Sequence, residues 1–166
     1  MVTLDKFTNT DFASLKQWIK SEEELIQFAG TIFNYPLTDS QLENYLKQKD
    51  LEPFKIKLNT TGEIIGHCEL NFSNGNSRLS RILIGKSDLR GKGIGKIIIT
   101  EMLKLIEKQK PNSIVDLNVF AWNNNAISCY KNLGFKENKS KNSTYNFKGN
   151  NWEVINMEIK LPITQV

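Results

Sequence analysis

Apolar and polar residues alternate along seven stretches of the chain, and this period of two predicts β-strands. The stretches are residues 2–7, 54–58, 63–72, 78–85, 114–120, 135–147 and 152–161. The turn-forming residues at 59–62 and the Asn74-Gly75-Asn76 segment join the second, third and fourth stretches closely enough to predict antiparallel pairing. The last two stretches predict a final hairpin.

Elsewhere, apolar residues recur at spacings of three and four, which predicts four helices. They cover a segment after Thr8 or Thr10, a short segment after the capping box Thr38–Gln41, residues 93–110 and residues 123–133. Pro111 stops the third helix, and Gly134 stands where a glycine commonly ends a helix. Residues 25–37 are aromatic-rich and contain Gly30 and Pro36, so we expect an irregular segment there.

The resulting order is β-α-α-β-β-β-α-β-α-β-β. It predicts an α+β (mixed α/β) domain in which one sheet carries helices on its faces. A chain of 166 residues suits a single domain spanning residues 1–166. No repeat, linker or low-complexity block divides it.

Composition narrows the classes of function. The net charge of +4 suits an anionic ligand such as a phosphorylated cofactor, although it also suits mere solubility. The lysines are dispersed among acidic residues, so no nucleic-acid partner is expected. Two cysteines make no disulfide framework, and His67 lacks companions at metal-binding spacing. We find no secretion signal and no apolar run of ~20 residues, so a cytoplasmic location without membrane attachment is expected.

One glycine-rich turn carries candidate chemistry, because Arg90-Gly91-Lys92-Gly93-Ile94-Gly95 lies between a predicted strand and a predicted helix. The first N–H groups of a helix have no internal partner, and the helix dipole places partial positive charge there. Glycines allow a phosphate to approach the backbone, and Arg90 and Lys92 add positive charge. The turn therefore predicts an anion site.

The spacing of the glycines excludes two common nucleotide loops. A phosphate loop needs G-x-x-x-x-G-K-[ST], but the residue five positions after Gly85 is Arg90, and five positions after Gly91 stands Lys96. The dinucleotide fingerprint G-x-G-x-x-G fails as well, since Lys96 occupies its third glycine position. The turn matches a third pattern, Q/R-x-x-G-x-G/A, through Arg90, Gly93 and Gly95.

A second motif follows one predicted strand later, from Asn123 to Phe135, with the pattern N-x-x-A-I-x-x-Y-x-x-x-G-F. Together the two motifs resemble the GNAT superfamily of N-acetyltransferases, in which the first is the coenzyme A pyrophosphate loop. The segments Gly66–Leu70 and Phe28–Thr38 resemble the branch with ribosomal-protein and small-molecule N-acetyltransferases. The resemblance implies a single central, mixed and mostly antiparallel sheet of about six or seven strands, flanked by about four helices.

The resemblance also implies acetyl-CoA as the co-substrate, with no metal, and assigns residues to it. Main-chain groups of Ile82, Leu83 and Ile84 would meet the pantetheine arm. The loop Arg90, Gly91, Lys92, Gly93, Ile94, Gly95 and Lys96 would hold the pyrophosphate. Asn123 would hydrogen-bond the pantetheine region beside Ala126, and Tyr130 would stand near the thioester sulfur as general acid.

The chemistry needs a base as well as an acid. An amine attacks the thioester directly, an oxyanion develops that backbone N–H groups can stabilise, and the leaving thiolate needs a proton. Glu69 is our candidate for the base that deprotonates the amine, with His67 or water as alternatives. Period two places His67 and Glu69 on one face of their strand. An acyl-cysteine intermediate on Cys129 is not expected, because that residue has no sequence-adjacent base.

Acceptor specificity is expected from aromatic segments outside the two motifs. Phe33 and Tyr35 are the candidates for a pocket wall, with the last hairpin around Tyr145 and Trp152, whereas Trp18 and Phe28 are expected in the core. The acidic run Glu22–Glu24 could attract a cationic amine, or it could simply be a solvated helix end.

Two functions from different classes remain open at this stage. The first is an N-acetyltransferase that acts on a small-molecule amine or a protein N-terminus. The second is a non-catalytic acyl-CoA-binding or interaction domain of the same fold. The expected partner is the amine acceptor, with a homodimer as a further option, and the acyl group is acetyl or longer.

Overall fold

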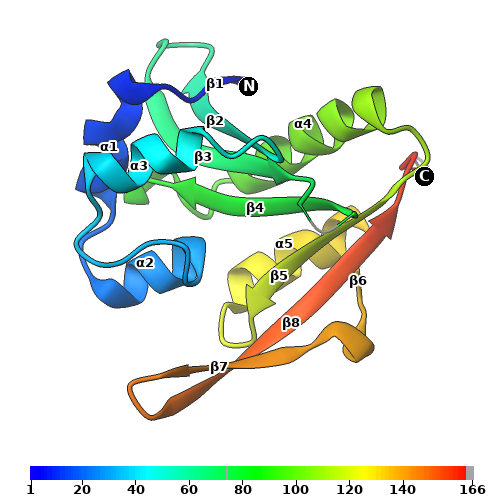
Figure 1. Ribbon diagram of the computed structural model, residues 1–166. Coiled ribbons are helices and arrows are strands. Elements are labelled where there is room, and N and C mark those ends of the chain that lie inside the picture. Colours follow the sequence, from blue (N-terminus) through cyan, green and yellow to red (C-terminus); the bar gives the residue numbers. More distant parts are fainter. Residues whose placement is uncertain (74, 164–166) are drawn as a thin grey trace.

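The computed structural model describes residues 1–73 and 75–163, so Asn74 of the expected hairpin turn lies outside the described residues. Within these ranges eight strands form one sheet (Figure 1). The strands are β1 (Val2–Lys6), β2 (Leu51–Leu58), β3 (Ile64–Asn71), β4 (Ser77–Ile84), β5 (Ile114–Phe120), β6 (Lys136–Glu137), β7 (Ser143–Phe147) and β8 (Asn150–Lys160).

Five α-helices accompany the described strands. They are α1 (Phe12–Trp18), α2 (Glu22–Ala29), α3 (Asp39–Leu46), α4 (Ile94–Gln109) and α5 (Asn124–Leu133), with short 3-10 turns at Asn9–Asp11, Ser87–Leu89 and Lys139–Lys141. Among the described residues, no helix is long and apolar enough to span a membrane. The same ranges hold no group of three or more histidine, cysteine or acidic side chains that could bind a metal ion.

The strands follow the spatial order β1-β2-β3-β4-β5-β8-β6, and β7 also pairs with β8. The β4–β5 pair is parallel and the other pairs are antiparallel. This confirms the expected mixed, mostly antiparallel sheet. The strand count exceeds the expectation because the 3-10 turn Lys139–Lys141 divides the predicted strand 135–147 into β6 and β7.

The sheet separates two apolar cores. One lies between the sheet and α4, whose buried face carries Ile98, Met102 and Ile106. The other lies under α1, α2 and α3 on the opposite face. Strand β3 serves both cores by alternation, since Cys68 and Leu70 join the first, whereas His67 packs against aromatic rings of the second.

Helix α2 was not expected from the sequence, which predicted an irregular segment from residue 25 to 37. The helix forms because Ser21 caps it, its side chain accepting from the Glu24 N–H, and because it buries Leu25, Ile26 and Phe28. Gly30 ends it with a positive φ of 61°. The irregular chain therefore begins only after Gly30.

Candidate active site

The sheet opens into a fork between β4 and β5. These parallel strands share only two register pairs in the described residues, Ser77 with Val115 and Arg78 with Asp116. Figure 1 shows the two strands close together at one end and far apart at the other. The end of β4, residues 82–84, therefore presents main-chain groups that β5 does not bond. This is where the sequence expects Ile82, Leu83 and Ile84 to meet the pantetheine arm.

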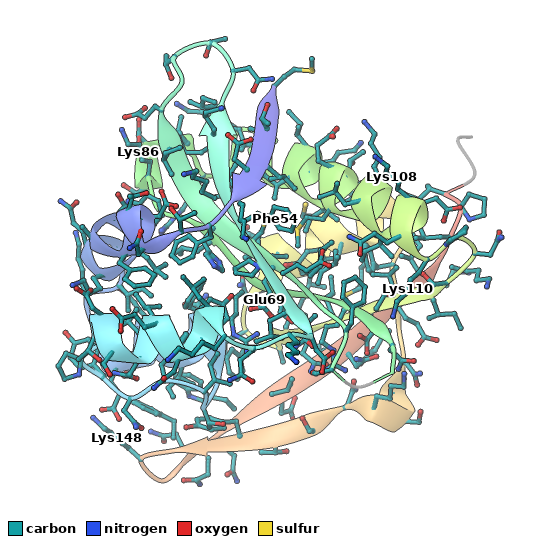
Figure 2. The ribbon with its side chains drawn as sticks, turned by 45° about the horizontal axis from the view of Figure 1, so that its top comes forward. Phe54, Glu69, Lys86, Lys108, Lys110 and Lys148 are labelled. Carbon is teal, nitrogen blue, oxygen red and sulfur yellow. The ribbon has the colours of Figure 1, made fainter. Side chains whose placement is uncertain are left out.

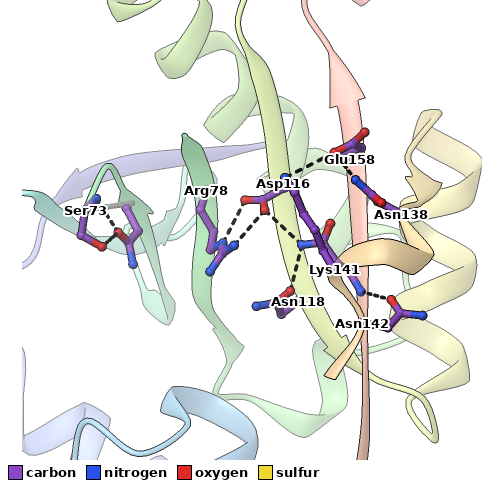
Figure 3. A network of polar contacts seen from close by, with 10 residues as sticks. Ser73, Arg78, Asp116, Asn118, Asn138, Lys141, Asn142 and Glu158 are labelled. Atoms are coloured by element: carbon purple, nitrogen blue, oxygen red, sulfur yellow. Dashed lines mark hydrogen bonds and ion pairs between the residues drawn. The ribbon is translucent and has the colours of Figure 1, made fainter. Parts of the chain in front are cut away.

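A polar network fixes the point where the fork opens (Figure 3). The guanidinium of Arg78 donates to both oxygens of Asp116, at 2.9 and 2.8 Å. The side-chain amide of Asn156 donates to Asp116 at 3.0 Å and to Asn118 at 2.9 Å, which ties β8 to β5. Burial alone would raise the pKa of Asp116, but the hydrogen bonds from Arg78 and Asn156 outweigh it, and the pKa is lowered.

The glycine loop follows β4 after the 3-10 turn Ser87–Leu89 and leads into α4. The Arg90 side chain folds back so that its Nε donates to the Ile84 carbonyl at 2.9 Å. Gly91 and Gly93 have φ values of 73° and 79°, which other residues adopt only with strain, and Gly93 is the N-cap of α4. The first helical N–H with a partner is that of Ile97, which donates to the Gly93 carbonyl. The preceding N–H groups of α4 are thus available to an anion.

The surroundings of this loop fit a pyrophosphate. A Cβ built on Gly95 would meet only the Cys129 sulfur, at 3.8 Å, so the glycine leaves open space beside the free N–H groups. Arg90, Lys92 and Lys96 are exposed around it and supply positive charge. A helix N-terminus with open backbone and flanking cations is the arrangement that binds phosphate groups in proteins.

Helix α5 positions the second motif beside the loop. The Asn123 side chain caps the helix, its Oδ1 accepting from the Ala126 N–H at 3.3 Å, so its amide NH2 can donate elsewhere. Tyr130 packs its ring near Phe135, with 5.9 Å between centroids. Burial raises the pKa of Tyr130 to about 12, which keeps the phenol protonated at neutral pH.

Strand β4 bulges opposite β3, close to the open end of the fork. The register changes from His67–Leu83 to Glu69–Ser80, so β4 has one extra residue there, and Arg81 takes a positive φ of 47°. The His67 Nδ1–H donates to the Arg81 carbonyl at 2.8 Å; a carbonyl only accepts, so this nitrogen carries the proton. The bulge therefore has a fixed peptide orientation.

Beneath the bulge, Glu69 forms the centre of a buried cluster and lies in the interior of the molecule (Figure 2). Its carboxylate accepts from the Tyr45 hydroxyl and from the Arg81 guanidinium. Burial raises the pKa of Glu69, although the Arg81 charge opposes this shift. Burial also lowers the pKa of His67 to about 4, so the ring is neutral. Both side chains expected as bases are thus enclosed and already hydrogen-bonded.

The residues expected to bind the acceptor are placed differently from one another. Phe33 is 5% exposed and packs edge-on against Tyr45 in the core under α1–α3. Tyr35 is 45% exposed and its hydroxyl donates to the Lys20 carbonyl. Phe28 lies in the core as expected. Trp18 covers the end of β4, where a Cβ on Gly85 would come within 2.1 Å of its ring.

Sequence reasoning missed Trp122, which lies directly before the Asn123 motif and is 48% exposed. Its ring stacks on Phe120 and stands edge-on to Trp152. The position of Trp122 directly before the Asn123–Phe135 motif was the one sequence signal that could have identified it. Trp122 belongs to an aromatic group at the end of β5 and β8 that borders the open end of the fork.

Comparison with known proteins agrees with this geometry. A spermidine N-acetyltransferase from Vibrio cholerae, solved with CoA and spermine, has a TM-score of 0.75 at 19% identity, with 96% of this chain and 95% of that one covered. The ribosomal-protein-S18-alanine N-acetyltransferase from Escherichia coli has a TM-score of 0.70 at 19% identity, with 100% and 96% covered. An aminoglycoside acetyltransferase, AAC(6')-Ib, solved with coenzyme A and kanamycin, has a TM-score of 0.70 at 21% identity, with 94% of each chain covered.

These likenesses show a shared fold. The sequence itself matches the model of the acetyltransferase (GNAT) family over residues 13–135, a range that includes both motifs and the bulge. This chain therefore belongs to the acetyltransferase (GNAT) family.

Proposed function

We propose that this protein transfers an acetyl group from acetyl-CoA to a primary amine by direct attack of the amine on the thioester. Membership of the family supports an acetyl-CoA-dependent acyltransferase. The similar structures include enzymes named for spermidine and aminoglycoside acetylation, some with coenzyme A bound, which supports a small-molecule amine as acceptor. A protein N-terminus is the other acceptor class to test.

One observation carries the proposal: the fork and the glycine loop are continuous. The strand end at Ile84 leads through Arg90 to the free N–H groups of α4, and the Arg90 side chain is bonded to Ile84 itself. An extended ligand with an anionic middle and a thioester end can thus bind the loop and the open edge of β4 together. Acetyl-CoA has this form.

Within this frame, the reaction divides among main-chain and side-chain groups. The amine nitrogen forms a bond to the thioester carbon, and N–H groups at the β4 bulge stabilise the oxygen that becomes negative. His67 holds the Arg81 carbonyl and so fixes the peptide orientation on which those N–H groups depend. The carbon–sulfur bond then breaks, and the departing sulfur takes the proton of the Tyr130 hydroxyl. Direct attack of the amine needs no cysteine nucleophile, and burial raises the pKa of the Cys129 thiol, which disfavours its thiolate.

The amine must lose a proton to act as a nucleophile. The two candidate side chains, Glu69 and His67, lie in the buried cluster with partners already bound. Water is the alternative that can reach an amine in the open fork, and we propose it as the immediate proton acceptor. Glu69 then does not touch the amine. It pairs with the Arg81 guanidinium and so offsets the positive charge beside the bulge.

The test is acetyl-CoA consumption with a panel of amines and peptides, for wild type and Tyr130→Phe. We expect at least one acceptor to be acetylated, and kcat to fall about a hundredfold in the variant, as for loss of a general acid. Binding of coenzyme A by both proteins checks that the variant keeps its fold. Unchanged kcat in Tyr130→Phe would remove its role. Binding without any acetylation would favour the non-catalytic domain.

A further inference from the structure

A cavity of about 440 Å³ lies between α2 and the aromatic group at the end of β5 and β8. It is lined by Ser21, Glu23, Glu24, Gln27, Trp122 and Trp152. The first four belong to α2 and its cap, Trp122 follows β5, and Trp152 lies on β8. A volume of this size is within the range of small-molecule sites.

One wall of the cavity is aromatic. The Trp122 and Trp152 rings stand edge-to-face, with 5.7 Å between centroids and 79° between planes. Phe120 supports both rings, stacking on Trp122 at 5.6 Å and meeting Trp152 edge-on at 5.1 Å. The group is therefore held rigidly while Trp122 remains half exposed. Indole faces attract ammonium groups and also cover methylene chains.

The opposite wall is acidic. Glu23 and Glu24 lie in the first turn of α2, where carboxylates also favour the helix dipole. Glu24 accepts from the Lys20 main chain at 2.7 Å, and Glu22, outside the cavity, pairs with Lys148 at the tip of the β7–β8 hairpin (Figure 2). The Glu23 side chain, by contrast, has no ion pair or hydrogen bond with any side chain or main-chain group of residues 1–73 and 75–163. The dipole explains acids on α2, but it does not explain the exposed tryptophans that face them.

The two walls select for a positive charge, which the reacting amine cannot have at the moment of attack. A nitrogen must be deprotonated to form a bond with the thioester carbon. A cation in this cavity is therefore a second ammonium group of the acceptor. Trp122 adjoins Asn123, the cap of the helix that carries Tyr130, so the cavity and the expected general acid are joined by one continuous segment of chain.

We propose, resting on the acetyl transfer argued above, that this cavity binds the non-reacting ammonium of the acceptor, and that the preferred substrates are diamines or polyamines. The protein as a whole has a net charge of +4, so this acidic and aromatic cavity is a local feature and does not follow from the overall charge. Glu23, Trp122 and Trp152 are then specificity residues, while coenzyme A binding is independent of them.

The experiment compares diaminobutane with butylamine, which has the same chain and lacks the second ammonium. With wild type, kcat/KM for the diamine is expected to exceed that for the monoamine by about tenfold or more. One cation–π contact with an indole, together with one nearby carboxylate, would give a preference of this size. Glu23→Gln should raise KM for the diamine and leave kcat/KM for the monoamine unchanged, because only the diamine brings a second charge to the cavity. Trp122→Leu should raise KM for both amines, and more for the diamine, because the indole covers the methylene chain as well as the ammonium. Melting temperatures confirm folding of each variant.

Glu22→Gln is the matched control, because it removes the same charge from the same helical turn but lies outside the cavity. It should leave the preference unchanged. Equal use of the two amines, or an equal effect of Glu22→Gln and Glu23→Gln, would overturn the proposal. If neither amine is acetylated, calorimetry measures the binding of diaminobutane to the coenzyme A complex. Binding that Glu23→Gln weakens would support the cavity although the proposed acetyl transfer fails. Absence of binding would refute the cavity proposal.

Discussion

Acid is expected to destabilise this protein through His67, which is the only histidine in the chain. Burial lowers the pKa of the folded ring to about 4, from an ordinary value of 6.5, while its Nδ1–H holds the Arg81 carbonyl at the bulge. The unfolded chain therefore binds a proton below about pH 6.5, whereas the folded chain does so only near pH 4. The buried neutral ring therefore contributes fully to the free energy of unfolding above about pH 6.5. This contribution is lost as the pH falls from about 6.5 to about 4.

The size follows from the pKa difference. A difference of about 2.5 units corresponds to about 3 kcal/mol in the free energy of unfolding, with a slope of up to about 1.4 kcal/mol per pH unit. The raised pKa of Glu69 acts with the opposite sign, because the folded state then takes up that proton more readily than the unfolded chain. The measured slope is the sum of the two, and a variant that lacks the histidine separates them.

The assay is urea unfolding, followed by tryptophan fluorescence, between about pH 7.5 and about pH 4.5. We expect stability of wild type to fall with pH, and the slope to flatten or reverse in His67→Gln, whatever its stability at neutral pH. The slope isolates titration from any packing change. Equal slopes in the two proteins, or an NMR titration of the folded ring near its ordinary pKa, would refute the reasoning.

Three further outcomes are expected. Gly66→Ala should lower the free energy of unfolding by about 1–3 kcal/mol in urea titrations, because its Cβ would lie 2.1 Å from a main-chain oxygen of β4; wild-type stability would contradict the close approach. Alkylation of Cys129, which lies against the glycine loop, should slow as coenzyme A is added. An alkylation rate that does not depend on the coenzyme A concentration would place the ligand elsewhere. Asp116→Asn should cost about 3 kcal/mol at neutral pH by leaving Arg78 without its partner. The cost should shrink as the pH falls below about 4, because the unfolded carboxyl of wild type takes up a proton there before the folded carboxyl, whose pKa is lowered; a deficit that persists in strong acid would argue against the ion pair.

Much of the fold could be predicted because local chemistry and tertiary structure agree along most of the chain. The glycine turn and the segment from Asn123 to Phe135 predicted the family and an acetyl-CoA-dependent acyltransferase, and the family match confirms both. Period two predicted that His67 and Glu69 lie on one face of their strand, and both contact the Tyr45 hydroxyl there. These features could be predicted from the sequence because each depends on residues that are close together in the chain.

Helix α2 could also have been predicted. Ser21 and Glu24 are spaced as in a capping box, and the main-chain N–H of Lys20 bonds the Glu24 carboxylate. The aromatic residues after Gly30 obscured this signal, and the short helix has only eight residues in which to show a period.

Other features depend on residues far apart in sequence and had no local signal. The positive φ of Arg81 arises where β4 has an extra residue relative to β3, which no single strand reveals. The enclosure of Glu69 requires Tyr45 from α3 to reach across to β3. The cavity brings Glu23 against Trp152, which only the packed fold can do. Assignments of individual site residues accordingly stay predictions until variants are measured.

The most direct test of the account is calorimetric binding of acetyl-CoA to wild type, Gly95→Ala and Gly95→Val. Gly95 lies in α4, and its Cβ direction is open except for the Cys129 sulfur, so both variants should fold with wild-type melting temperatures. We predict binding by wild type, binding by the alanine variant, and affinity about tenfold or more weaker in the valine variant, whose side chain fills the space assigned to the pyrophosphate. Wild-type affinity in a folded Gly95→Val protein would show that coenzyme A does not bind at this loop.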